Sequence, residues 1–549
     1  MPQCQNCQKE FTIYPEDREF YQKIEVPEPT WCPDCCLMRR LAFRNERNLY
    51  QRKCDATGKT IISLFQVDSP YKVYEPDYWW SDKWEPLEYG RDYDFSRGFF
   101  EQIEELFRQV PRAGVLSMRG AVNCDYCSST LGKNCYLCFL WYGNDCLYCT
   151  WGLNVNDSVD LLHTEMCEIC YQLTDARRCY NVKFSHQCYD CWDSAFLFDC
   201  RNCHDCFGGV NLRNTSYVFW GEKLSKEEYE QRLKTIDLGD YEQLEKYNQK
   251  YQEFKKQAIY RNLEYLKSIN CHHCEYVDGC KNCYECFDLW RVEDSRYVYN
   301  SGECREAVNS SYFGMNSELA YECIGGGTGA YNLKFCETVR GSANMEYCAF
   351  CHNCHDCLAC SGLQNKKYCL LNKQYGKKEY KELAEKIKKQ AREQGEYGQF
   401  FPLRMALYPY NDSYAHVLFP KTQEEVVTMG GWWQDFQEKK EYSNQILTQD
   451  LPNHIREVSD DILDRTIICA ESGRGFKIIK QELDFYQKHN LPLPRFHPEV
   501  RHQHRLNQRR ARQFFKRKCS RCGKIVESTI AVADPRRVYC EDCYQKEIY

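Results

Sequence analysis

Residues 199–217 read DCRNCHDCFGGVNLRNTSY, and a similar pattern returns at residues 350–368 as FCHNCHDCLACSGLQNKKY. A second pair of segments repeats at a similar interval, GKNCYLCF at 132–139 and CKNCYECF at 280–287. Within each block, cysteine pairs recur between short apolar runs that are separated by Asn, Asp and Gly. Repeated short strands with polar turns are typical of a solenoid, so we predict two β-solenoid blocks in the centre of the chain.

The spacing of the central cysteines predicts the coil size and leaves two roles open for the thiols. Pairs that recur at steps of about 9 to 12 residues and about 21 residues favour a coil of roughly 20 to 22 residues. Residues i and i+3 of a flat strand face opposite sides, so a C-x2-C pair could share a metal only at a turn. The thiols are therefore either apolar core residues or ligands of zinc or iron–sulfur clusters. The candidate ligands in the centre are Cys124, Cys127, Cys135, Cys138, Cys200, Cys203, Cys206, Cys351, Cys354 and Cys357.

The two ends of the chain are copies of each other. Residues 4–78 match residues 469–543 without a gap, at a constant offset of 465 residues. For example, FYQK at 20–23 recurs as FYQK at 485–488. A match of this length predicts duplicated modules that flank a different centre.

Each module contains two potential four-ligand sites, and a different one is intact in each copy. The intact sets are Cys4, Cys7, Cys32 and Cys35 in the first module and Cys519, Cys522, Cys540 and Cys543 in the last. Their counterparts in the other copy are Cys469, Ser472, His497 and Val500, and Cys54, Thr57, Glu75 and Tyr78. Paired C-x2-C thiolates suit tetrahedral Zn²⁺, so we predict about two structural zinc sites, with reduced core cysteine as the alternative.

The second cysteine pair of each intact site precedes a helix-like segment, an arrangement similar to that of treble-clef zinc ribbons. Four segments resemble a group of uncharacterised cysteine-rich zinc-ribbon proteins from uncultivated small-genome bacteria: RNERNLYQRKCDATGK, YWWSDKW, ESGRGFKIIKQELDFYQKHNLPLP and CEDCYQKEIY. The resemblance implies zinc ribbons and no established activity.

The predicted fold class is an α+β multidomain protein. Duplicated terminal treble-clef modules flank a cysteine-rich β-solenoid-like centre with helical insertions. The predicted domains are a double zinc-ribbon module (1–80), a connector (81–119), solenoid block 1 (120–225), a helical insertion (226–269), solenoid block 2 (270–375), a helix with an aromatic-rich small domain (376–468) and a second double zinc-ribbon module (469–549).

Basic residues gather beside the ribbons, although the net charge of the whole chain is only -6. Clustered arginines interleaved with aromatic residues can bind phosphates and stack on bases, so we predict contact with RNA or DNA. The alternative is that these arginines form a solvated helix face or dock onto acidic parts of the chain. The candidate nucleic-acid-binding residues are Arg39, Arg40, Arg44, Arg47, Arg505, Arg509, Arg510, Arg512, Lys516 and Arg517.

Composition narrows the class of protein. The chain has 39 cysteines in 549 residues, and it shows neither a long apolar run nor a secretory signal. We therefore expect a cytoplasmic protein without a membrane span, whose thiols are reduced. The sequence contains no phosphate-binding loop, nucleophile elbow, H-E-x-x-H or dinucleotide fingerprint. We expect a non-enzymatic, zinc-binding protein that contacts nucleic acid. The alternatives are an iron–sulfur or thiol-based electron-transfer protein, and a zinc-stapled scaffold that binds a protein partner.

Overall fold

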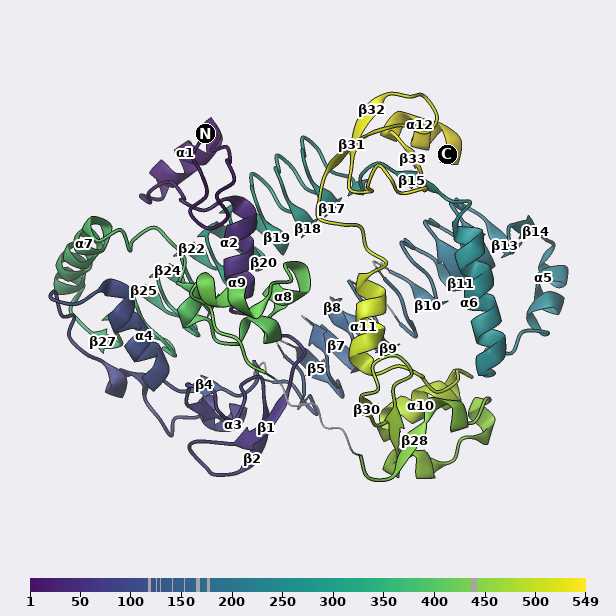
Figure 1. Ribbon diagram of the computed structural model, residues 1–549, viewed down its shortest axis with the longest axis horizontal. Coiled ribbons are helices and arrows are strands. Elements are labelled where there is room, and N and C mark those ends of the chain that lie inside the picture. Colours follow the sequence, from purple (N-terminus) through teal and green to yellow (C-terminus); the bar gives the residue numbers. More distant parts are fainter. Residues whose placement is uncertain are drawn as a thin grey trace. The chain divides into compact units, whose positions relative to one another are not determined.

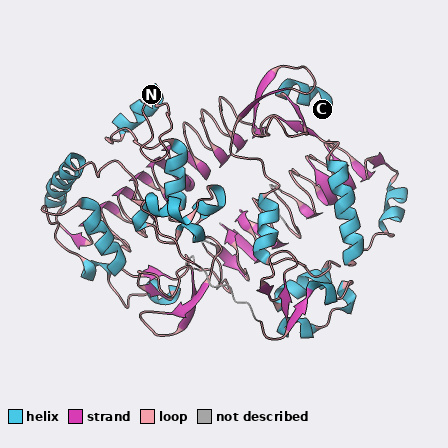
Figure 2. Ribbon diagram, viewed as in Figure 1, coloured by secondary structure: helices cyan, strands magenta, loops and turns pink. Residues whose placement is uncertain are grey.

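The computed structural model describes residues 1–549 apart from residues 117–119, 125, 129, 141, 153, 164–167, 175–177 and 436–441. The described part is α+β, with β-solenoid coils that carry helices and small sheets (Figures 1 and 2). The chain divides into two compact units. Unit 1 comprises Met1–Val115 and Leu263–Asp435, and unit 2 comprises Leu116–Asn262 and Phe436–Tyr549. Each unit therefore combines one terminal module with one solenoid block.

Unit 1 contains the longer described solenoid. Among its described residues the helices are α1 (Pro15–Lys23), α2 (Pro33–Leu41), α3 (Pro76–Trp79), α4 (Phe99–Gln109), α7 (Lys377–Glu393), α8 (Tyr414–Leu418) and α9 (Gln423–Thr428). The strands of its small sheets are β1 (Tyr50–Lys53), β2 (Thr60–Ser63), β3 (Val73–Tyr74) and β4 (Arg112–Ala113). The solenoid strands are β16 (Tyr265–Leu266), β17 (Glu275–Asp278), β18 (Phe287–Trp290), β19 (Tyr299–Val308), β20 (Ser311–Tyr321), β21 (Ile324–Gly327), β22 (Tyr331–Lys334), β23 (Glu337–Arg340), β24 (Ala343–Glu346), β25 (His355–Leu358), β26 (Lys367–Leu370) and β27 (Lys373–Gln374).

Unit 2 repeats this plan. Its described helices are α5 (Lys226–Leu233), α6 (Tyr241–Lys255), α10 (Lys480–Lys488), α11 (Pro498–Leu506) and α12 (Glu541–Ile548). The solenoid strands are β5 (Leu131–Lys133), β6 (Phe139–Leu140), β7 (Tyr142–Leu147), β8 (Thr150–Gly152), β9 (Val155–Val159), β10 (Tyr180–Lys183), β11 (Trp192–Phe198), β12 (His204–Val210), β13 (Ser216–Phe219) and β14 (Glu222–Lys223). The other strands are β15 (Ile259–Arg261), β28 (Gln445–Leu447), β29 (Thr466–Ile468), β30 (Gly475–Phe476), β31 (Phe515–Lys518), β32 (Ile525–Ser528) and β33 (Arg537–Tyr539).

The β-solenoid prediction is confirmed, but the predicted coil of 20 to 22 residues is wrong. Strands of successive coils pair in parallel, and most partners are 12 residues apart, as in Trp192↔His204 and Phe287↔Tyr299. The first coils of unit 2 are shorter, with an offset of 11 residues at Leu131↔Tyr142. At the end of each block a final antiparallel pair, β13–β14 or β26–β27, closes the sheet.

A left-handed backbone residue at every third position explains the short coil. Asn202 and Asp205 both have a φ of 50°. Each such residue turns the chain, so the residue after it points inward, and a C-x2-C pair projects two thiols into one interior from adjacent sides. Asn and Asp tolerate this conformation better than most residues, which accounts for the N-C and D-C dipeptides. At one corner their side chains also form a ladder, in which Asn270 donates to Asn282 over 2.9 Å and Asn282 to Asp294 over 2.7 Å.

The interior of the solenoid is narrow and lined largely by cysteine. Cys200 is fully buried, and its thiol lies 3.4 Å from the carbonyl oxygen of Phe198 and 3.7 Å from that of Gly209 in the next coil. The same pattern of donation to two carbonyls recurs at Cys286. Burial raises the pKa of Cys206 to about 12, which favours the protonated thiol there. Cysteine, a small side chain with a weak hydrogen-bond donor, therefore fits this interior. This agrees with the first of the two roles that the sequence leaves open, in which the central thiols are apolar core residues.

Outside the solenoid, a second core in unit 2 joins one solenoid face to the terminal module. Tyr171 and Phe196 of the solenoid pack in one cluster with Leu483 and Tyr486 of α10. Helix α6 covers part of the same face, and the hydroxyl of Tyr251 donates to the carbonyl of Leu197 over 2.7 Å. The solenoid thus supplies a flat apolar surface on which the module is seated.

The narrow interior predicts a strong dependence on side-chain size. We expect Cys200→Leu to lower the free energy of unfolding of unit 2 by about 1 to 3 kcal/mol, because added methylene groups find no room in a packed core. Cys200→Ser, which keeps a donor in a smaller volume, is the matched control and should cost less. Urea-induced unfolding followed by tryptophan fluorescence measures both. A Leu variant as stable as the parent protein would contradict a narrow interior.

Candidate metal centres and docking contacts

The first intact cysteine set forms a compact group in unit 1. The sulfur atoms of Cys4, Cys7, Cys32 and Cys35 all lie within 4.8 Å of one another. The first pair follows residue Gln3, which bridges Glu10 in a short hairpin, and the second pair opens α2. Cys32 is the N-cap of this helix and Pro33 its first residue, a position that suits proline. Hydrogen bonds hold the sulfurs, since the Cys32 main-chain N–H lies 3.2 Å from the Cys4 sulfur.

The second intact set forms an equivalent group in unit 2. The sulfur atoms of Cys519, Cys522, Cys540 and Cys543 also lie within 4.8 Å of one another. Cys540 is the N-cap of α12, and its N–H lies 3.3 Å from the Cys519 sulfur. Within the described ranges, these are the two groups in which three or more candidate ligand atoms approach this closely.

One thiol in each group is held toward the thiolate form, Cys4 in the first and Cys519 in the second, whereas burial raises the pKa of Cys7 and Cys540. Burial alone would raise the pKa of Cys4, but hydrogen bonds from the main chain of Cys7 and Cys32 outweigh it and lower this pKa to about 7. The same balance lowers the pKa of Cys519 to about 6. Because thiolates are the form that binds metal, four clustered sulfurs on two rigid turns could hold a tetrahedral ion. The structure thus confirms that each predicted set could hold a metal ion, and zinc as that ion stays a prediction.

The degenerate half of each module keeps part of the ligand geometry. The main-chain N–H of Glu75 lies 3.2 Å from the Cys54 sulfur, and that of Ser472 lies 3.5 Å from the Cys469 sulfur. Hydrogen bonds lower the pKa of both thiols despite burial. The turn therefore persists where the other three ligands have been replaced.

In unit 1, the helix that opens on the metal group docks onto the solenoid through buried charge. Arg39 lies 2.7 Å from the carboxylate of Glu322 and Arg40 lies 3.7 Å from it. All three side chains are at least 96% buried. Glu322 is a left-handed corner residue of the solenoid with a φ of 50°. Two buried arginines thus share one carboxylate, and the attraction is strong because water is excluded.

Unit 2 shows the equivalent contact on the helix that has lost its metal ligands. Arg505, the counterpart of Arg40, lies 3.0 Å from Asp160, and Arg501 pairs with the same carboxylate. Asp160 is again a left-handed corner residue, with a φ of 57°. Glu482 of α10 lies 3.3 Å from Arg501 and is also fully buried. The docking contact has therefore survived the loss of the metal site.

The second helix of each module also docks onto its solenoid block. In unit 2, Tyr544 of α12 is fully buried, its hydroxyl donates to Asp199, and Arg213 donates to that hydroxyl. Asp199 is a third left-handed corner carboxylate, with a φ of 48°. The counterpart of Tyr544 in unit 1 is Trp79, which is 1% exposed and packs against His352 at 5.9 Å between ring centroids.

The structure buries most of the candidate nucleic-acid-binding arginines. Besides the solenoid contacts, Arg44 lies 2.6 Å from Glu46, and Arg517 donates to the main-chain carbonyls of Ile530, Ala531 and Arg536. The buried members of the set are Arg39, Arg40, Arg44, Arg505, Arg510 and Arg517. The partly or fully exposed members are Arg47, Arg509, Arg512 and Lys516. Packing within the chain thus accounts for the buried arginines, and contact with nucleic acid stays a prediction.

The candidate ligands in the centre lie in the two solenoid interiors. All ten are buried. Where one of these thiols donates a hydrogen bond, the acceptor is a main-chain carbonyl, as in the bond from Cys138 to the carbonyl oxygen of Cys146 over 3.3 Å. Residue 167, another cysteine of this pattern, lies outside the described residues. Metal binding by the central cysteines stays a prediction.

Sequence reasoning missed the carboxylates that anchor the modules, Glu322, Asp160 and Asp199. The available signal was the recurrence of Arg40 as Arg505 in equivalent segments of the two modules, but nothing in the sequence indicated the partner residues. Comparison of the chain with protein-family models, with curated proteins and with solved structures gives no match. Among the described residues, no helix has the length and apolar character needed to cross a bilayer.

The shared carboxylate predicts a large effect of removing its charge. We expect Glu322→Gln to destabilise unit 1 by roughly 3 to 5 kcal/mol, because two buried arginines lose their counter-charge. Glu318→Gln, four residues earlier on the solenoid and 35% exposed, is the control and should have little effect. Chemical denaturation of both variants is the measurement, and equal stabilities would show that the buried pair does not anchor α2.

Proposed function

We propose that the protein is a zinc-stapled scaffold, in which each ion fixes the helix that seats a terminal module on its solenoid block. One observation carries this proposal: both intact cysteine groups open a helix that docks onto a solenoid corner. In α2, Cys35 and Arg39 are one helical turn apart, so a metal that fixes the first also positions the second. In α12, Tyr544 directly follows Cys543.

The chemistry of the donor set supports zinc as the ion. Four cysteine thiolates at tetrahedral spacing leave no open coordination position for a substrate, which is the pattern of structural rather than catalytic zinc. The arrangement of two knuckles, hairpins and a helix supports a treble-clef assignment for each module. Both features favour a binding protein over an enzyme.

An exposed aromatic ladder on solenoid block 1 supports the scaffold role. Tyr180, Trp192 and His204 follow one another on adjacent coils, and Tyr180 and Trp192 are 47% and 41% exposed. The rings of Trp192 and His204 are stacked at 5.4 Å. Rigid exposed aromatic residues are enriched in protein interfaces, so this face suits a protein partner.

Metal content tests the proposal directly. Elemental analysis of anaerobically purified protein should give two zinc ions per chain and no visible absorption. Cys7→Ser combined with Cys35→Ser should give one zinc ion, because a serine hydroxyl is a poor substitute for thiolate. Cys54→Ser, in the degenerate site, is the control and should retain two. Iron with sulfide, or clearly more than two zinc ions, would instead support metal clusters in the solenoid.

A second candidate function, contact with RNA or DNA, is favoured by the C-terminal hairpin. Lys516 and Lys518 project from the same exposed face of β31, and the exposed Lys524 follows in the adjoining turn. No carboxylate of the described residues pairs with these three lysines within 4.0 Å, so their charges are available to phosphates. The proposed contact therefore shifts from the buried arginines to these lysines.

Salt-dependent binding tests this second function. Fluorescence anisotropy with a labelled 20-nucleotide single-stranded RNA should show affinity that falls with salt. Lys516→Glu with Lys518→Glu should reduce the slope of log K against log salt by about 1.4, the value for two phosphate contacts. Lys377→Glu with Lys378→Glu on α7 makes the same charge change on another surface and serves as control. Absence of binding at low salt, or equal losses in both double variants, would contradict the contact.

A further inference from the structure

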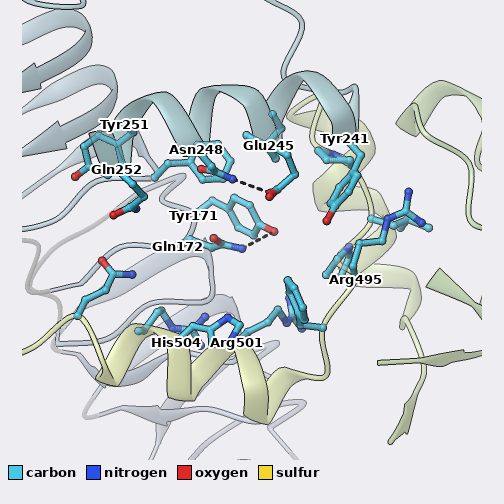
Figure 3. A pocket seen from close by; sticks show the side chains of 18 residues that line it. Tyr171, Gln172, Tyr241, Glu245, Asn248, Tyr251, Gln252, Arg495, Arg501 and His504 are labelled. Carbon is cyan, nitrogen blue, oxygen red and sulfur yellow. Dashed lines mark hydrogen bonds between the residues drawn. The ribbon is translucent and has the colours of Figure 1, made fainter. Parts of the chain in front are cut away.

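Unit 2 contains a small cavity between α6, α11 and the segment 492–496 (Figure 3). Its volume is about 250 Å³, and Tyr171 and Phe184 of the solenoid form part of its lining. Sites for drug-sized ligands usually measure about 300 to 1,000 Å³, so this cavity suits a smaller molecule, about the size of an amino acid. Leu244 and Leu493 add apolar surface.

The α6 wall of the cavity carries an acceptor for a cationic group. The carboxylate of Glu245 accepts a hydrogen bond from Asn248 over 2.9 Å, and Tyr241 and Tyr171 lie beside it in Figure 3. Within the described part of the chain, no Lys, Arg or His nitrogen pairs with Glu245 within 4.0 Å. A carboxylate flanked by aromatic rings is a favourable site for an ammonium group.

Basic residues line the opposite side of the cavity, with Arg501, His504 and Arg505 on α11 and Arg495 at its end. The three on α11 already face carboxylates, because Arg501 and Arg505 pair with Asp160 and His504 lies 2.8 Å from Glu471. Arg495 is 7% exposed, stacks on the ring of Tyr241 at 4.5 Å and donates to the carbonyl of Pro452 over 3.1 Å. No carboxylate among the described residues lies within 4.0 Å of its guanidinium. A buried cation that has only neutral partners is stabilised when an anion binds nearby.

We infer that this cavity binds a zwitterionic ligand of amino-acid size with an aromatic or apolar side chain. The ammonium group of the ligand contacts Glu245, its carboxylate lies toward Arg495, and its side chain packs on Phe184, Leu244 and Leu493. Among the described residues, Glu245 has no cationic partner and Arg495 has no carboxylate partner within 4.0 Å, which favours a molecule that carries both charges over a simple anion or cation. The site is independent of the zinc groups and of the lysines proposed to contact nucleic acid.

Three matched probes test the inference by isothermal titration calorimetry on the full chain. These are L-phenylalanine, 3-phenylpropionate, which lacks the ammonium group, and 2-phenylethylamine, which lacks the carboxylate. We expect L-phenylalanine to bind at least tenfold more tightly than either analogue. Glu245→Gln should weaken L-phenylalanine tenfold or more and leave 3-phenylpropionate unchanged. Glu242→Gln, on the exposed side of α6, should change neither affinity.

Three results would overturn the inference. Equal affinities for the three probes would mean a purely apolar cavity, and no saturable binding of any of them would mean no such site. Tighter binding of guanosine 5′-monophosphate than of L-phenylalanine would assign the cavity to a nucleotide. A circular dichroism spectrum and two bound zinc ions in the Glu245 variant show that it is folded, and they keep this test separate from that of zinc stapling.

Discussion

A left-handed residue at every third position of the solenoid is the constraint on which the rest of the structure depends. It sets a 12-residue coil and points one residue per side inward, into a narrow core of cysteine together with other apolar side chains. It also sets the position of the corner residues themselves. Glu322, Asp160 and Asp199 are all corner residues, and each of them anchors a helix of a terminal module.

The docking of the modules follows from charge placed at those corners. A carboxylate buried beneath a helix needs a counter-charge, and arginine provides several donors in a planar group that tolerates burial. The duplicated module supplies this contact twice, through Arg40 in unit 1 and Arg505 in unit 2. Since one of these helices has a cysteine group and the other has none, the ion pair and the metal are separable supports. Each module nevertheless keeps one intact cysteine group, which indicates that one staple is sufficient for each unit.

The sequence predicts the local chemistry better than the long-range contacts. C-x2-C spacing predicts the cysteine groups because the ligand pair is formed within one turn, and the structure brings Cys4 and Cys32, or Cys519 and Cys540, together as expected. The cysteine spacing predicts too long a coil, because cysteine positions alone do not show that Asn and Asp turn the chain every three residues. The sequence cannot tell whether the arginines near Arg40 and Arg505 contact phosphates or the chain itself, because a basic helix has the same sequence whether it faces solvent or a buried carboxylate. Burial decides whether such a helix faces solvent or a carboxylate. This burial depends on Glu322 and Asp160, which lie more than 280 positions away from Arg40 and Arg505 in the sequence.

Hydrogen–deuterium exchange before and after metal removal tests the central claim most directly. If the ions fix the docking helices, chelation should raise exchange in α2 and around Glu322, and in α12 and around Asp199. Exchange in α11 and around Asp160 should change little, because the ion pairs there do not depend on a metal. Unchanged protection of α2 and α12 in the metal-free protein, or equal loss of protection in α11, would contradict the account.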